Sequence, residues 1–375
     1  MNVIEVNLLM KPYQSKLVSH SIAGAARDKV FQKLLTSQHE EIFALVGPSG
    51  VGKSTVLHRV QERLIEHYQD RMFQDPGFIP FISVTTVTGL DGTYSWRDGF
   101  ARLLTAGCEP LVGNKERVKL QLDGQDITNA RGLVRDEFRR ALESLVKNRG
   151  VKYIFLDEAS AIFDAAVNRH PLRQFNILKS LCVSMNVTIV LGGAYDLLGF
   201  QDGTGQLIRR SEIIHMPRYQ LSRASENDET MTDLDCFVEA MQNLIEAIPV
   251  QIEDGLFADE PYYLIKSVGC VGIFKTWLGK AAVDALLNND GVLTKVVMER
   301  NALPIRALEK LTTEAMFGEK TILDLPSSNL AALYGLNSLT GFDLPNKSEE
   351  SIRKIKKGRV GLRGPSRDVA GGLHA

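Results

Sequence analysis

Hydrophobic residues in the first 220 positions form short apolar runs that alternate with segments of helical periodicity. Runs of strand length occur at residues 42–46, 78–87, 151–156, 187–191 and 212–216. Apolar residues at helical spacing lie between or before them, at residues 22–37, about 53–68, 95–105, 130–147 and 171–185. Nearly unbroken apolar strands that alternate with helices are typical of a parallel sheet covered on both faces. The pattern therefore predicts an α/β fold built on a parallel five-stranded sheet.

The pattern changes after Pro217. Residues 221–260 carry 11 acidic side chains and one basic one, and helical periodicity then continues to about residue 335 with no clear strand. From residue 347 onward, eight Lys or Arg and six Gly or Pro leave too little apolar surface to bury. We therefore expect a helical lead-in at residues 1–40, an α/β domain at 41–220, an all-helical lid subdomain at 221–340 and a basic disordered tail at 341–375.

Composition narrows the class of protein without identifying it. The 375 residues are 44% hydrophobic and 24% charged, which is ordinary for a globular protein, and the net charge of −1 gives no overall basic signal for nucleic acid. The four cysteines form no CxxC pair, which disfavours a zinc site and suits a reducing compartment. The first residues lack the apolar core of a secretion signal, and no run reaches the roughly 20 residues that span a bilayer. We expect a cytoplasmic protein without a membrane partner.

Residues 47–54 (GPSGVGKS) match the phosphate-binding pattern G-x-x-x-x-G-K-[ST], between a predicted strand and a predicted helix. Glycines let backbone N–H groups close around an anion, and the helix N-terminus adds a favourable dipole. We predict that Lys53 contacts the β- and γ-phosphates of ATP and that Ser54 binds Mg²⁺. A Gly-rich turn with a surface lysine is the alternative. The predicted nucleotide-binding residues are Gly47, Pro48, Ser49, Gly50, Val51, Gly52, Lys53, Ser54 and the neighbouring Thr55.

Two carboxylates follow the strand predicted at residues 151–156. Asp157, at its end, could hold Mg²⁺ beside Ser54, and Glu158 could orient and polarise the attacking water. Acidic residues also end strands without any catalytic role. Together with the phosphate-binding loop, however, the pair predicts ATP hydrolysis rather than a kinase, because a kinase needs no water-activating carboxylate at this point.

The phosphate-binding loop, the Asp-Glu pair on the third strand and the helical lid together resemble the AAA+ ATPases. Two further blocks resemble the TniB/TnsC-type transposition regulators more narrowly. One comprises NRHPL, LKSL and GAYDLL at residues 168–172, 178–181 and 193–198. The other, which is more specific, runs from GQLIRRS to IHMPRY at residues 205–211 and 214–219. With SWRD at residues 95–98, the resemblance covers roughly residues 20–280.

The resemblance implies a homo-oligomer that binds ATP between subunits and assembles as a ring or filament on duplex DNA without sequence preference. Such an assembly would link a TniQ-like target-selection protein to the transposase, and ATP hydrolysis would dismantle it. Arg209 and Arg210 match the subunit-interface arginines of the family. Either could stabilise charge on a neighbour's γ-phosphate, or the pair could form salt bridges at a helix end.

The resemblance also implies two nucleotide sensors and a DNA-contacting region. Lys275, near the start of a lid helix, matches a second sensor, although a solvated helix lysine has the same signature. The first sensor is usually polar, but the matching stretch here is Gly-Gly-Ala-Tyr at residues 192–195. Contacts to DNA phosphates need no base readout, so Lys, Arg and Thr suffice, although each could equally be a solvated side chain. The candidate DNA-binding residues are Thr93, Arg97, Arg102, Lys115, Arg117 and Lys119.

Two other classes of function stay open. A signalling or scaffold P-loop NTPase usually carries a long repeat or effector domain. A replication initiator or loader-type AAA+ ATPase normally needs a winged-helix or collar domain. The sequence indicates neither after residue 340. ATP-dependent assembly that DNA stimulates without sequence preference would distinguish the transposition regulator from both.

Overall fold

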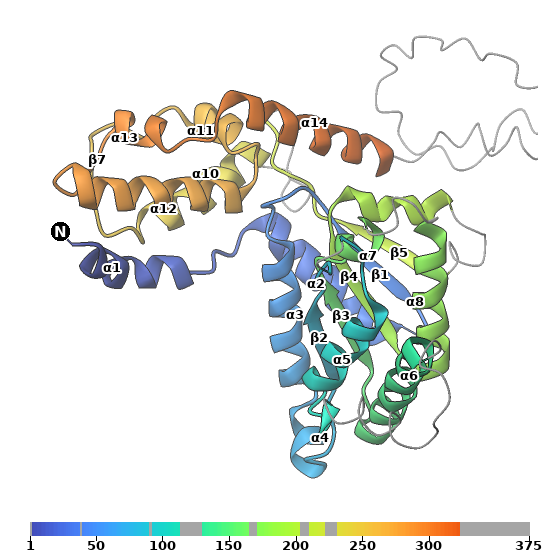
Figure 1. Ribbon diagram of the computed structural model, residues 1–375. Helices are drawn as coiled ribbons and strands as arrows, with labels where there is room; N and C mark the ends of the chain where they lie inside the picture. Colours follow the sequence, from blue (N-terminus) through green and yellow to red (C-terminus); the bar gives the residue numbers. More distant parts are fainter. Residues whose placement is uncertain are drawn as a thin grey trace, which may run out of the picture. The chain divides into compact units, whose positions relative to one another are not determined.

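The computed structural model describes residues 2–37, 40–89, 92–112, 130–164, 171–202, 210–221 and 231–322. Its centre is a five-stranded parallel sheet in the order β2-β3-β4-β1-β5 (Figure 1). The strands are β1 (Ile42–Val46), β2 (Phe81–Thr85), β3 (Tyr153–Asp157), β4 (Thr188–Gly193) and β5 (Ser211–His215). The predicted α/β class and the parallel five-stranded sheet are therefore confirmed.

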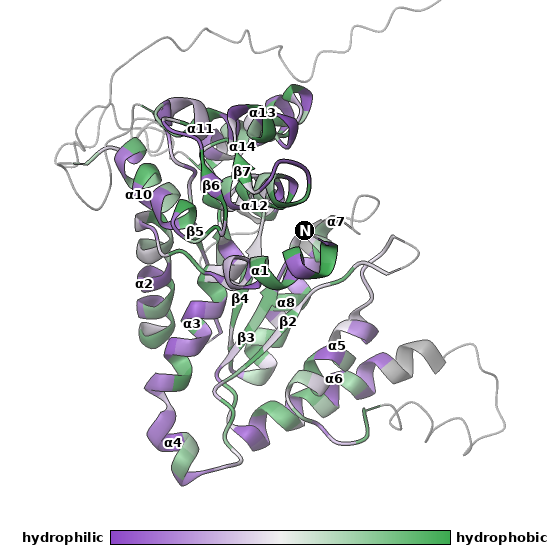
Figure 2. Ribbon diagram, turned by 90° about the vertical axis from the view of Figure 1, so that its left-hand side faces the viewer, coloured by the Kyte–Doolittle hydropathy of each residue, from purple (hydrophilic) through white to green (hydrophobic). Residues whose placement is uncertain are grey.

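Helices cover both faces of this sheet, as the alternation of side chains along β1 shows. Phe43 and Leu45 point into one apolar cluster with α2 (Ser21–Thr36) and α3 (Lys53–His67). The alternate positions of β1 point into a second cluster with α5 (Trp96–Ala106), α6 (Ala130–Arg149) and α8 (Pro171–Met185). Figure 2 shows hydrophobic colouring along the central strands. Burial on both faces explains why these strands are continuous apolar runs rather than alternating ones.

The parallel register brings the carboxyl ends of the strands to one edge of the sheet. Val46, the last residue of β1, pairs with Gly193 of β4 and with His215 of β5. On the far side of β4, Asp157 of β3 pairs with Thr85 of β2. The segments that follow these strands therefore meet at the same edge, where open α/β sheets bind their ligands.

The lid subdomain is helical, as predicted, with one difference. Its helices are α10 (Asp233–Ile245), α11 (Glu260–Lys266), α12 (Val271–Asn288), α13 (Lys295–Arg300) and α14 (Ile305–Ile322). Phe237, Phe274 and Trp277 lie in its apolar cluster. Two strands of two residues, β6 (Gln251–Ile252) and β7 (Val292–Leu293), also pair in parallel, so the expectation of no strand in the lid is wrong. Two residues are too short a run for hydrophobic periodicity to reveal.

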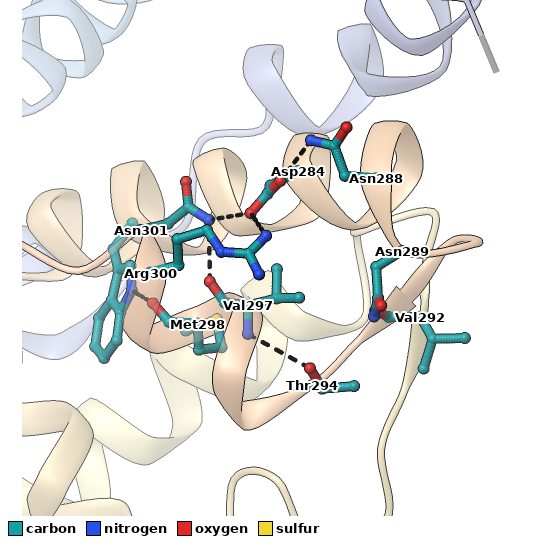
Figure 3. Close-up of polar contacts among 10 residues, drawn as sticks. Asp284, Asn288, Asn289, Val292, Thr294, Val297, Met298, Arg300 and Asn301 are labelled. Atoms are coloured by element: carbon teal, nitrogen blue, oxygen red, sulfur yellow. Dashed lines mark hydrogen bonds and ion pairs between the residues drawn. The ribbon is translucent and has the colours of Figure 1, made fainter.

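Polar side chains hold the end of α12 against α13 (Figure 3). Asp284 accepts hydrogen bonds from Asn288 and Asn301, both at 2.8 Å, and pairs with Arg300 at 3.3 Å. These donors, Asn288 first, lower the pKa of the Asp284 carboxyl. The two helices are thus joined by a hydrogen-bonded carboxylate in addition to their apolar contacts.

A further helix, α1 (Val3–Ser15), lies within the predicted helical lead-in, although the apolar pattern placed a helix only at residues 22–37. Asn2 and Glu5 form a capping box at its start, each accepting a hydrogen bond from the other's backbone N–H. Its buried side chains, among them Met10 and Tyr13, belong to the apolar cluster of the lid, whereas α2 packs on the sheet. Residues 1–40 therefore contribute to two apolar clusters, α1 to that of the lid and α2 to that on the sheet.

Residues 323–375, which include the predicted tail, lie outside the described part of the chain. None of the described helices combines the length and apolar character needed to cross a membrane.

Candidate nucleotide-binding site

The loop between β1 and α3 has a backbone that only glycine accommodates at several points. Gly50 and Gly52 have φ angles of 79° and 107°, in the left-handed region. A Cβ atom at Gly47 would lie 2.3 Å from the carbonyl oxygen of Met216, and one at Gly50 would lie 2.7 Å from Cγ1 of Ile273. The sequence pattern thus corresponds to a closely approached loop at the N-terminus of a helix, which fits a bound phosphate.

Lys53, the first residue of α3, folds its ammonium group back over this loop. The Nζ atom donates hydrogen bonds to the carbonyl oxygens of Gly47 at 3.0 Å and Pro48 at 2.9 Å. Burial lowers the pKa of Lys53, while nearby acidic groups act in the opposite direction, Glu158 most strongly and Asp157 less. The predicted lysine and both predicted carboxylates therefore share one electrostatic environment at the carboxyl edge of the sheet.

Asp157 and Glu158 are held by the strands on either side of β3. The hydroxyl of Thr86, which follows β2, donates to the carbonyl oxygens of both residues. A Cβ atom at Gly192 of β4 would lie 2.9 Å from Oδ1 of Asp157, so this glycine leaves room for the carboxylate. Glu158 has a φ angle of 51° and an exposed side chain. Such a conformation is uncommon for a residue other than glycine, and it directs attention to Glu158 as a functional position.

Ser54 lies in the first turn of α3 with an exposed side chain, one residue after Lys53. Its hydroxyl and the half-buried Asp157 carboxylate supply oxygen ligands of the kind that Mg²⁺ prefers when phosphate oxygens complete its shell. No cluster of three or more His, Cys, Asp or Glu side chains that could hold a metal occurs within the described ranges.

Asp196, two positions after Ala194, is a polar side chain near this edge of the sheet. Asp196 accepts a hydrogen bond from Ser160 Oγ at 2.8 Å, and Ser160 Oγ in turn accepts from the Ala194 N–H at 3.3 Å. Asp196 also contributes to the negative field around Lys53. Asp196 lies within the GAYDLL block at residues 193–198, but the family resemblance assigned it no role.

The lid contacts the phosphate-binding loop through backbone atoms rather than through Lys275. The N–H of Gly272, in the first turn of α12, donates to the carbonyl oxygen of Gly50 at 2.9 Å. The Lys275 Nζ atom instead donates to the carbonyl oxygens of Gln14 and Lys16, at 3.0 and 2.7 Å, at the C-terminal end of α1. Unpaired carbonyls at a helix end attract a cation. The structure therefore does not bring the predicted second sensor to the loop.

Of the two predicted interface arginines, Arg209 lies outside the described residues. Arg210, at the start of β5, forms an ion pair with Glu40 at 2.8 Å. Ser211 pairs with Ile42 at the opposite end of β1 from the phosphate-binding loop, about 13 Å away at the usual rise per residue. Arg210 is thus far from the loop of its own subunit, and the salt-bridge alternative describes its present partner.

A cavity of about 260 Å³ lies between the segment before α2, α2 itself and the first turns of α3. No sequence motif predicts this cavity, because its lining comes from the segment before α2 and from α2 and α3 themselves. Thr55 is the one predicted nucleotide-binding residue that lines it. The other lining residues are Leu17, Val18, Ser19, Ala23, Gly24, Arg27, Val56 and Arg59.

The predicted DNA-contacting residues are only partly described. Thr93 and Arg97 are exposed, and Arg102 is exposed but paired with Asp98 at 2.6 Å. Lys115, Arg117 and Lys119 lie outside the described residues. Trp96 packs against the apolar cluster of α5 and donates to Gln174 at 2.8 Å, which agrees with its predicted role in the core.

Comparisons with known proteins found a family model and several solved structures that are similar to this chain. Residues 36–200 match the family model described as AAA domain. Similar solved structures include the ORC2 protein of Aeropyrum pernix in ADPNP–ADP complexes, with 13% identity, a TM-score of 0.44 and coverage of 85% of this chain and 73% of that chain. A Walker-type ATPase of Pyrococcus abyssi is 16% identical, with a TM-score of 0.44 and coverage of 79% of this chain and 73% of that chain. AMPPCP-bound DnaA from Aquifex aeolicus is 14% identical, with a TM-score of 0.38 and coverage of 78% of this chain and 70% of that chain. No curated protein matches the sequence. The match to the AAA domain therefore spans the loop at residues 47–54 and Asp157 and Glu158, and it coincides with the parallel sheet that the motifs predicted.

Proposed function

We propose that this protein is a Mg²⁺-dependent ATPase. The observation that carries this proposal is the meeting of the glycine loop, Lys53, Asp157 and Glu158 at one edge of the sheet. The backbone of the loop and the Lys53 ammonium would hold the phosphates. Ser54 and Asp157 would hold Mg²⁺, which neutralises charge on the phosphates when it is bound.

Glu158 would act as the base. Its carboxylate is exposed at the same edge, and of the groups that raise the pKa of Lys53 it acts most strongly, so it is the carboxylate best suited to this role. A carboxylate in this place orients and polarises the attacking water. The cavity lined by Leu17, Ala23 and Thr55 would take the base and sugar of the nucleotide, because it adjoins the start of α3.

We further propose that the ATPase regulates DNA transposition as a homo-oligomer on duplex DNA, linking a TniQ-like target-selection protein to the transposase. The sequence blocks at residues 168–198 and 205–219 support this finer function. The distance of Arg210 from its own loop is compatible with a role at a neighbour's nucleotide, which would require Arg210 to exchange Glu40 for phosphate. Exposed Thr93 and Arg97 are suitable for contacts to DNA phosphates.

Assembly on DNA tests this proposal most directly. Purified protein is mixed with a non-hydrolysable ATP analogue and with duplexes of unrelated sequence, and the products are followed by sedimentation and electron microscopy. We expect rings or filaments on every duplex, and none with Lys53→Ala. A protein that stays monomeric and ignores DNA contradicts the transposition proposal. Assembly that depends on one particular DNA sequence supports the initiator class instead.

A further inference from the structure

Arg218 lies in the segment that connects the sheet to the lid, beside the phosphate-binding loop. Two residues earlier, the Met216 N–H donates to the carbonyl oxygen of Val46 at 2.8 Å, at the start of the loop. One residue later, the Tyr219 N–H donates to Gly269 at 2.9 Å, just before α12. The backbone of Arg218 is therefore fixed between the loop and the lid helix that touches it.

The side chain of Arg218 is paired with a carboxylate from a distant part of the chain. Its Nε and terminal nitrogen lie 3.1 and 3.5 Å from the two carboxylate oxygens of Glu319 on α14. The side chains are only 15% and 16% exposed, and Gln220 donates to the same carboxylate at 3.3 Å. A two-point contact of this kind is the geometry with which arginine also recognises phosphate.

The residue before Glu319 joins α14 to the same edge of the sheet. A Cβ atom at Gly318 would lie 2.0 to 2.4 Å from ring atoms of Tyr195, so the ring occupies the space that any side chain would need. Tyr195 follows β4, and its hydroxyl lies 3.1 Å from Nε2 of His215 at the end of β5. Two adjacent residues of α14 thus contact the segments that follow two strands of the nucleotide-binding edge.

The charges of this contact lie close to those of the nucleotide site. Cys270 is the buried residue before α12, and burial raises the pKa of its thiol to about 12. Arg218 and Lys53 both act on that thiol in the opposite direction, and Glu319 acts with burial. The Cys270 thiol is therefore close enough to feel the charges of both Arg218 and Lys53. This agrees with the backbone contacts that place Arg218 beside the loop.

We propose that Arg218 is a phosphate-sensing residue of the nucleotide site and that Glu319 competes with the terminal phosphate of ATP for its guanidinium group. The inference rests on the proposed binding of ATP at the loop. Transfer of the guanidinium from Glu319 to phosphate leaves a buried carboxylate without its cation, which disfavours the docked position of α14. ATP and the contact of α14 with Tyr195 and Arg218 are then coupled, so each weakens the other.

Nucleotide affinities of charge variants test the competition. Kd values for an ATP analogue and for ADP are measured by fluorescence, together with thermal unfolding of each variant. We expect Glu319→Gln to tighten the ATP analogue relative to ADP by about tenfold, because the competitor loses its charge. Arg218→Gln should weaken the ATP analogue relative to ADP by a similar factor, and Arg218→Lys should weaken it less. Glu314→Gln, which removes the exposed partner of Lys310 on the same helix, should leave the ratio unchanged.

Each alternative outcome is distinct. A purely structural ion pair predicts that the Glu319 and Arg218 variants lose thermal stability while the ratio of the two affinities stays within twofold of wild type, and that result overturns the proposal. A second variant is independent of charge: Gly318→Ala forces α14 away from Tyr195 and should shift the ratio in the same direction as Glu319→Gln. If wild type binds neither nucleotide, as expected for Lys53→Ala, the ATP site itself is wrong and the competition is overturned with it.

Discussion

The contact between the lid and the phosphate-binding loop makes Gly272→Ala a sharp test of how the two are connected. Gly272 is helical, so alanine has no backbone strain there and gains about 1 kcal/mol of helix propensity. Its Cβ atom, however, would lie 2.5 Å from the carbonyl oxygen of Gly50. That oxygen belongs to the backbone and cannot rotate away, so α12 or the loop has to move by almost 1 Å.

The expected loss of stability follows from three contributions. The hydrogen bond from the Gly272 N–H to Gly50 is worth about 1 kcal/mol. Forcing apart a close contact costs about 1–3 kcal/mol, and the gain in helix propensity offsets about 1 kcal/mol of the total. We therefore expect the free energy of unfolding to fall by about 1–3 kcal/mol, with a fall in Tm of about 2–4 °C for each kcal/mol.

Thermal unfolding and nucleotide affinity are the assays for this variant. Gly199→Ala is the matched control, because a Cβ atom there meets nothing within 4 Å, so its Tm should equal or slightly exceed that of wild type. Gly272→Ala should also weaken nucleotide binding, since it displaces the loop that holds the phosphates. If Gly272→Ala is as stable as the control and binds nucleotide like wild type, the lid does not rest on the loop as described.

Three further outcomes follow from the site. Glu158→Gln should bind ATP but hydrolyse it at least about a hundredfold more slowly, measured by phosphate release, and wild-type turnover would show that Glu158 is not the base. Arg210→Ala should keep nucleotide affinity and lose turnover in assemblies; added Lys53→Ala subunits should restore it, and failure of this rescue would contradict a role in trans. Burial lowers the pKa of His20 to about 4. Between pH 6.5 and 4 the unfolded chain therefore binds more protons than the folded protein, so the free energy of unfolding falls by up to about 3 kcal/mol as the pH is lowered through that window. His20→Gln should flatten this pH dependence of Tm, and an unchanged slope would show that His20 is not its source.

The sheet and the loop could be predicted from the sequence because the signals are local. The central strands are apolar runs of about five residues, as at Ile42–Val46, because burial on both faces favours an apolar side chain at every position. The glycines of the loop stand at fixed offsets from Lys53, because each meets a fixed steric need. The same logic placed Asp157 and Glu158 at the end of β3.

Helix α1 shows why local patterns fail elsewhere. Its buried residues, such as Val6 and Met10, have helical spacing, but Ile4 and Leu8 are exposed on the other side, so no single apolar face stands out. The capping pair Asn2 and Glu5 was the one signal that could have revealed the start of the helix. Because α1 was not recognised in the sequence, the carbonyl groups that bind Lys275 were not known, and the position of Lys275 away from the loop could not be predicted.

Gly50 shows why nucleotide binding and the position of the lid cannot be independent if the loop binds phosphate as proposed. Its left-handed backbone shapes the loop, its carbonyl accepts the hydrogen bond from Gly272, and its Cα hydrogen faces Ile273, where a Cβ atom would have no room. Any change in the loop on binding phosphate therefore reaches the first turn of α12 through one hydrogen bond and one close contact. The pair of Arg218 and Glu319 joins the same edge to a second helix of the lid, α14. If binding of phosphate releases one of these contacts, the lid would be free to rotate about the other, and in the proposed assembly this would change the surface that a neighbouring subunit meets.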